Sequence, residues 1–178
     1  EKFNRDYVIL LRRDITDFDN PSIGNYGGNM TIDLGGFTAS FGDYALDFYV
    51  DNNASNGLTN GFDVRGSFTV KNGTMKRISG TFPLVCVNYG EATTNNVYCD
   101  FTFESVEFIS TSGSRFILDT WENGYSKATA TVTTDVTFRD CTFNVKDSIA
   151  GTNFLPLNNV SNGSESGKDR SIYNVKIF

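Results

Sequence analysis

The amino-acid sequence predicts an all-β solenoid, a fold that repeats one strand-rich unit along its axis. A pattern that reads apolar, any, small polar, small or apolar, any, apolar occurs five times, with Leu34 in place of the small polar residue in the first. Its first apolar positions are spaced 38, 33, 35 and 34 residues apart, and they are Ile32, Val70, Phe103, Phe138 and Ile172. Self-similarity at a period of this length is the sequence signature of a repeat architecture. We therefore expect about five coils of roughly 33–38 residues each.

The composition agrees with many short strands and few helices. The 178 residues include 17 Gly, 16 Phe and 8 Tyr but only 3 Pro, which suits strands joined by turns. No window shows the sustained i, i+3, i+4 apolar spacing of an amphipathic helix. The length fits one domain, and no linker divides the chain. We predict a single domain over residues 1–178 that is a fragment of a longer protein.

Other segments of the chain fit the same unit. Residues 7–15 are expected to form a strand pair, and 30–41 a strand that bends at Gly35-Gly36. A second set of short strands precedes long polar loops, and each strand places alternate apolar residues on one face. We align the last apolar residue of each strand as one column: Val50, Val87, Leu118 and Leu157.

At this point the repeated segments resemble a known fold family. Residues 138–143 and 172–177, each a strand with a tight polar turn, resemble the coils of the right-handed parallel β-helix of the pectate-lyase superfold. The segment 30–37 is similar to the first strand of such domains in bacterial surface and secreted proteins. The resemblance covers residues 7–178 and implies a fold rather than an activity. This fold hosts lyases, hydrolases, phage tailspikes, adhesins and non-catalytic scaffolds.

A polar column at the bend of each unit fits this resemblance. Asn and Asp side chains tolerate the left-handed backbone conformation and bond to nearby backbone groups in turns. We predict a structural turn ladder made of Asn72, Ser105, Asp140 and Asn174. Cys141 falls in the column of Val106 and Val175, and we interpret it as a small buried residue.

Charge and composition exclude several functions. The formal charge of −6 disfavours binding to nucleic acid or to an anionic membrane surface, and no apolar run is long enough to insert into a membrane. Because the chain has no His, it has no Ser-His-Asp triad, no Cys-His dyad and no His-bearing zinc site. We predict no metal site.

Paired carboxylates are the remaining route to catalysis. The Asn-Thr-Asp segment and the Asp-Asp pair of polygalacturonases are both missing. Pectate lyases hold Ca²⁺ with clustered acids beside an Arg, and Asp51, Asp119 and Arg115 are the residues that come nearest to that set. In our alignment, Asp51 and Asp119 lie two coils apart, roughly 10 Å, too far to share one Ca²⁺. We therefore assign no catalytic residue and expect no cofactor, Ca²⁺ being the only ion to consider.

Binding residues are expected in the loops. Residues 119–125 hold the only Trp of the chain, two acids and a Tyr, and Tyr89 occupies the corresponding loop one coil earlier. Aromatic faces flanked by hydrogen-bonding groups suit a sugar ring or a protein partner. The candidate ligand-binding residues are Tyr89, Asp119, Trp121, Glu122 and Tyr125.

These observations favour a non-catalytic extracellular module of a surface or adhesin-type protein that binds glycan or protein through its loop side. We expect its open ends to be covered by further domains of the same chain or by another subunit. Two alternatives stay open. One is a polysaccharide lyase or glycoside hydrolase of the same superfold, and the other is a segment of a phage tail fibre or tailspike.

Overall fold

The computed structural model describes most of the repeated strands and fewer of the loops between them. The described residues are 6–16, 22–25, 29–42, 46–50, 64–79, 85–89, 97–110, 118–122, 132–145 and 171–178. They form strands, turns and bends, and this part of the chain contains no helix. Accordingly, the described residues offer no helix that could cross a membrane. The prediction of an all-β chain is confirmed at this level.

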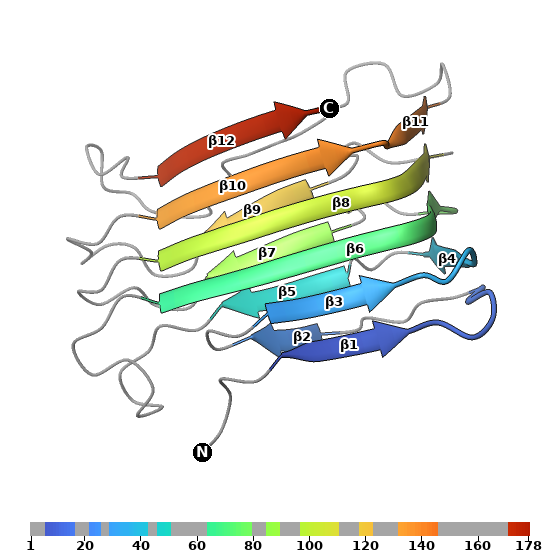
Figure 1. Cartoon of the computed structure of the whole chain (residues 1–178), viewed down its shortest axis with the longest axis horizontal. Helices are drawn as coiled ribbons and strands as arrows, with labels where there is room; N and C mark the ends of the chain where they lie inside the picture. The colour runs from blue at the N-terminus through green and yellow to red at the C-terminus, as the bar shows by residue number, and fades with distance from the viewer. Residues whose placement is uncertain are drawn as a thin grey trace.

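The strands form two parallel sheets. The larger sheet has eight strands: β1 (Tyr7–Leu10), β3 (Asn29–Asp33), β4 (Thr38–Phe41), β6 (Val64–Arg77), β8 (Val97–Ser110), β10 (Val132–Arg139), β11 (Thr142–Val145) and β12 (Ser171–Ile177). The smaller sheet has four strands: β2 (Ser22–Asn25), β5 (Leu46–Val50), β7 (Val85–Tyr89) and β9 (Leu118–Glu122). Figure 1 shows the smaller sheet behind the larger one, with its arrows running in the opposite direction. The chain thus passes from one sheet to the other and back.

The register of the larger sheet follows the repeat in the sequence. Ile32 pairs with Val70, Val70 with Phe103, and Phe103 with Phe138, all in parallel strands. These are the positions that the recurring pattern predicts, so their alignment is confirmed. Each of the four side chains is at most 5% exposed, because period two places them on the inward face of the sheet.

The last strand differs from this expectation. Ile177, not Ile172, pairs with Phe138, and Ile172 pairs with Thr133. In the other repeats the six-residue pattern spans the bend that follows the strand, whereas at residues 172–177 it lies within the straight strand β12. Val175 therefore pairs with Val136, so it is not in the column of Cys141. The segment 172–177 has the residue types of the repeated pattern, but its position in the sheet differs by five residues from the sequence alignment.

A left-handed residue marks the bend at the end of the straight strand segments. Asn72, Ser105 and Asp140 have φ of 59°, 54° and 52°. In the first repeat the bend consists of Gly35 and Gly36, with φ of 62° and 84°. Short polar residues and glycine tolerate this conformation. The bend turns β6 and β8 so that their second halves pair with β4 and β11.

Phenylalanine rings dominate the core behind the larger sheet. Phe103 stacks on Phe138 with ring centroids 5.1 Å apart and meets Phe101 and Phe108 at 5.2 Å each. Phe101 in turn stacks on Phe68 at 5.3 Å. All five rings are at most 1% exposed. Offset-stacked and edge-to-face contacts of this kind stabilise the fold beyond the burial of apolar area.

Small and polar residues also enter the core. Val106 is 1% exposed, and Cys141 at the equivalent position after the next bend is half-buried, where loss of solvent raises the pKa of its thiol. Cys99 is fully buried, and the thiol of Cys141 donates to the carbonyl oxygens of Phe103 and Arg139. Arg77 is buried as well, with its guanidinium donating to the carbonyl oxygen of Gly42.

Candidate functional site

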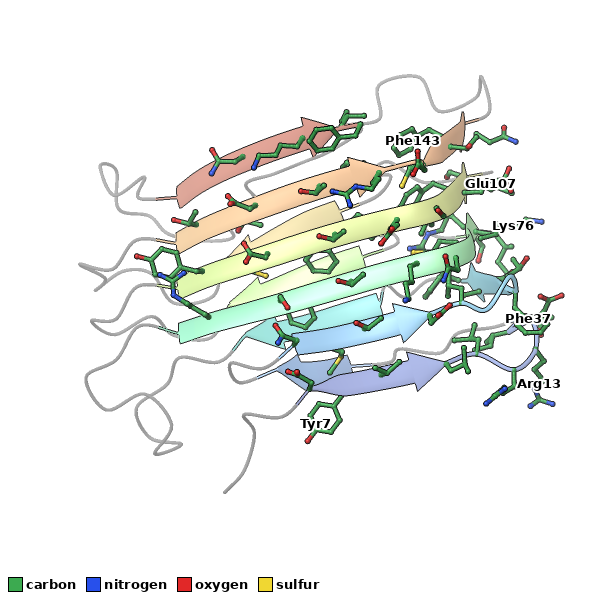
Figure 2. All side chains as sticks on the ribbon, viewed as in Figure 1. Tyr7, Arg13, Phe37, Lys76, Glu107 and Phe143 are labelled. Atoms are coloured by element: carbon green, nitrogen blue, oxygen red, sulfur yellow. The ribbon has the colours of Figure 1, made fainter. Side chains whose placement is uncertain are left out.

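The outward side of the larger sheet carries three columns of polar side chains, which we call the outward polar face. Its members alternate with the buried residues along each strand, since successive side chains point to opposite faces. The first column contains Asn29, Ser67, Asp100, Asp135 and Asn174. The second contains Thr31, Thr69, Thr102 and Thr137. The third contains Asp33, Lys71, Glu104 and Arg139. Figure 2 views this face directly and shows short side chains on each of its strands.

Hydrogen bonds connect neighbouring side chains at both ends of the first column. The amide nitrogen Nδ2 of Asn29 donates to Oδ1 of Asp6 at 2.9 Å, and the hydroxyl of Ser67 donates to the amide oxygen of Asn29. At the other end, Nδ2 of Asn174 donates to Oδ1 of Asp135 at 2.6 Å. These bonds order the side chains at the spacing of the strands, about 4.8 Å.

The third column alternates in charge. Asp33 and Lys71 form an ion pair with 3.7 Å between Oδ2 and Nζ. The backbone N–H of Gly35 donates to Oδ1 of Asp33 at 3.0 Å, and Nδ2 of Asn72 donates to the same oxygen at 3.1 Å. The Gly35 bond is the main reason that the pKa of Asp33 is lowered from its usual value. Partial burial opposes this effect, while Asn72 and the charge of Lys71 add to it.

The lowered pKa predicts an acid-dependent loss of stability that the variant Asp33→Asn should lack. The folded state favours the ionised carboxylate, so Asp33 stabilises the protein at pH above the usual pKa of 3.8. That contribution is lost as the pH falls through the lower pKa of the folded state. Urea midpoints measured from pH 6 down to pH 2 should fall less steeply for Asp33→Asn than for the unmodified protein. Equal slopes would contradict this assignment.

The aromatic ring of Tyr98 borders the outward polar face beside the first column. The guanidinium carbon of Arg65 lies 4.1 Å from the ring centroid of Tyr98, and the two residues pair directly on β6 and β8. A guanidinium at this distance is held by the electrostatics of the ring. Both side chains are at least partly exposed, so a planar, hydrogen-bonding platform adjoins the first column.

The outward polar face also contains two neighbouring carboxylates. Asp100 and Asp135 lie side by side on β8 and β10, but Asp100 is exposed, whereas a glycosidase places its acid in a water-excluding cleft.

A cavity of about 430 Å³ lies beyond β1, lined by residues 13–16. There, Asp14 accepts a bond from the backbone N–H of Thr38 at 2.8 Å. No three Cys, Asp or Glu side chains of the described residues gather as a metal would need.

The residues predicted to bind a ligand lie on the smaller sheet or outside the described residues. Backbone register pairs Tyr89 with Glu122, Asn88 with Trp121, and Cys86 with Asp119, on the adjacent strands β7 and β9. Four of the five candidates therefore occupy neighbouring strands. Tyr125, like residues 51 and 115–117, lies outside the described residues.

The residues of the predicted turn ladder occupy two different places. Asn72, Ser105 and Asp140 each sit at a bend with positive φ. Asn174 instead lies within β12, in register with Asp135. It belongs to the first column of the outward polar face, because the last repeat is placed five residues differently from the sequence alignment.

Sequence reasoning missed the outward polar face, although a signal for it exists. Thr occurs one position before each of Ile32, Val70, Phe103 and Phe138. Asn, Ser or Asp occurs three positions before each of them. Reading the outward positions of the aligned repeats, as well as the apolar ones, would have revealed both columns.

Neither the protein-family models, nor the curated proteins, nor the solved structures gave a match to the chain.

Proposed function

We propose that this chain is a non-catalytic, extracellular glycan-binding module of a surface or adhesin-type protein, built as a right-handed parallel β-helix of about five coils. One observation carries the binding function: the outward polar face presents hydroxyl, amide and carboxylate groups in register across four adjacent strands, β3, β6, β8 and β10. A polysaccharide also repeats its hydrogen-bonding groups along a line, so it can meet one side chain after another.

The β-helix part of the proposal rests on connectivity. Each strand of the smaller sheet lies in sequence between two neighbouring strands of the larger sheet. Crossovers between parallel strands of one sheet are right-handed in nearly all proteins. The extracellular placement rests on the resemblance to domains of secreted and surface proteins.

Glycan fits this surface better than a protein partner does. Protein interfaces bury a core of aromatic and aliphatic side chains, whereas the three columns contain hydroxyls, amides and charged groups. Sugar rings need hydrogen bonds and an aromatic or planar surface, and the Arg65–Tyr98 pair lies beside the first column. The competing candidates are the residues predicted from the sequence: Tyr89, Asp119, Trp121, Glu122 and Tyr125.

A glycan array with matched variants tests the proposal. Thr102→Val removes one hydroxyl from the centre of the outward polar face and keeps the shape of the side chain. Thr142→Val makes the same change at an exposed position on β11, outside the three columns. We expect Thr102→Val to weaken binding of the retained glycan about ten-fold, the equivalent of roughly 1.4 kcal/mol, and Thr142→Val to leave it unchanged. Each glycan that binds is then examined for cleavage.

The outcomes separate the competing functions. Loss of binding in Trp121→Ala alone would move the site to the smaller sheet and the loop that follows it. Cleaved product would overturn the non-catalytic assignment in favour of a lyase or hydrolase. Absence of any bound glycan on the array would overturn glycan binding.

A further inference from the structure

The two outer strands of the larger sheet leave apolar side chains exposed. The strand order starts at β1 and ends at β12, and in the described part of the chain no strand pairs with their outer edges. Val8 on β1 is 72% exposed and Ile177 on β12 is 63% exposed. Figure 2 shows the side chain of Tyr7 projecting beyond the outer edge of β1. Natural edge strands are usually protected by charged side chains or proline, yet β1 reads Tyr-Val-Ile-Leu.

The backbone groups of the two edges are in complementary phase. The backbone N–H of Phe178 donates to the carbonyl oxygen of Phe138, and its carbonyl oxygen accepts from the N–H of Asp140. In β12, the backbone N–H and C=O groups of residues 174, 176 and 178 therefore point toward β10, and those of Val175 and Ile177 point to the outer edge. In β1, the backbone N–H of Leu11 donates to the carbonyl oxygen of Asp33. The backbone N–H and C=O groups of Val8 and Leu10 therefore point to the outer edge of β1. A parallel pairing of Ile177 with Ile9 joins these groups without a gap, and a shift by one residue does not.

The side chains continue the columns in that same register. Val175 and Ile177 are the last residues of two inward columns that begin at Tyr7 and Ile9. A second copy would therefore place Tyr7 over Val175, Ile9 over Ile177 and Leu10 over Phe178. Lys176 would lie diagonal to Asp6 of the next copy, within reach of a long side chain.

We propose that a second copy of this chain covers the exposed edge, with β12 of one copy pairing in parallel with β1 of the next in the register Ile177 to Ile9. The contact joins two different surfaces, so it repeats head to tail and forms an open stack rather than a closed dimer. The stack extends the outward polar face from one copy to the next.

Cysteine cross-linking tests both the contact and its register. The variant Ile9→Cys is mixed with the variant Ile177→Cys under mild oxidation, and each is also oxidised alone. We expect disulfide-linked dimers in the mixture and none in either single variant. The double variant Ile9→Cys/Ile177→Cys should give a ladder of multimers. The double variant Val8→Cys/Ile177→Cys, whose cysteines lie on opposite faces of the sheet, should give none. All variants retain the native cysteines.

Light scattering on charge variants gives an independent measurement. Val8→Lys and Ile177→Lys should reduce the mass at high concentration to that of the monomer. Ile177→Lys places a charge over the apolar Ile9, and Val8→Lys places a second positive charge opposite Lys176 of the neighbouring copy. Thr102→Lys adds the same charge in the middle of the sheet and should leave the mass unchanged. A monomer at every concentration, or dimers from Ile177→Cys alone, would overturn the proposal. Tight binding of a different polypeptide with no self-association would do so too.

Discussion

Replacing Phe103 by Ala should destabilise the protein by about 3–5 kcal/mol, the usual loss when a fully buried phenylalanine is truncated. Phe103 is completely buried. Its ring centroid lies 5.1–5.2 Å from the ring centroids of Phe101, Phe108 and Phe138. The cavity would open in the middle of the stack, where rigid rings on both sides cannot collapse into it. Urea unfolding followed by circular dichroism measures the effect as a lower midpoint with an unchanged slope.

Two further variants separate the causes of that loss. Phe103→Leu keeps most of the buried volume and removes the aromatic contacts, so it should cost about 1–1.5 kcal/mol. Thr102→Ala changes the neighbouring residue on the outward face and should stay within roughly 0.5 kcal/mol of the unmodified protein. If Phe103→Ala cost less than about 1 kcal/mol, the ring stack would not be the centre of the core.

The inward positions of the larger sheet could be predicted because burial leaves a clear trace in the sequence. Ile32, Val70, Phe103 and Phe138 must all be apolar to fill one column, and a polar residue there would lose its water without compensation. The bends could be predicted from a conformational preference. Asn72, Ser105 and Asp140 are the short polar residues that a left-handed conformation tolerates.

The register of the smaller sheet could not be predicted in the same way. The sequence alignment placed Val50, Val87 and Leu118 in one column, but the structure pairs Phe48 with Val87 and Val85 with Leu118. A slip of one residue would move every side chain to the opposite face, and the pattern forbids it. A slip of two residues keeps each side chain on its face, so alternation alone does not distinguish the two registers.

The outward polar face was missed for a related reason. Its residues are solvated, so neither hydrophobic periodicity nor a catalytic motif points to them. Only the correct register reveals that Thr31, Thr69, Thr102 and Thr137 form one column. Conversely, the loop around Trp121 attracted attention by composition alone, and composition does not place its side chains.

Replacing Gly73 by Ala should be the most damaging small substitution near the bend, because the backbone leaves no room for a methyl group. A Cβ on Gly73 would lie 2.5 Å from Cβ of Leu34 and 2.5 Å from the carbonyl oxygen of Phe37. Neither atom can move freely, since Leu34 is 2% exposed and the Phe37 oxygen accepts from the backbone N–H of Thr74 at 3.1 Å. We expect a loss of about 3 kcal/mol, the upper end of the range for overpacking.

Gly36→Ala is the matched control because Gly36 has a left-handed backbone and free space around it, whereas Gly73 has an ordinary backbone and no free space. Gly36 has a φ of 84°, yet no atom lies within 4 Å of its added Cβ. Its substitution should cost only the strain of a left-handed alanine, about 1–2 kcal/mol. Hydrogen exchange locates the damage: Gly73→Ala should expose the Thr74 amide, whose bond to Phe37 lies at the clash, whereas Gly36→Ala should leave that amide protected. If Gly36→Ala proved the more destabilising of the two, backbone conformation rather than close packing would limit substitution at the bend.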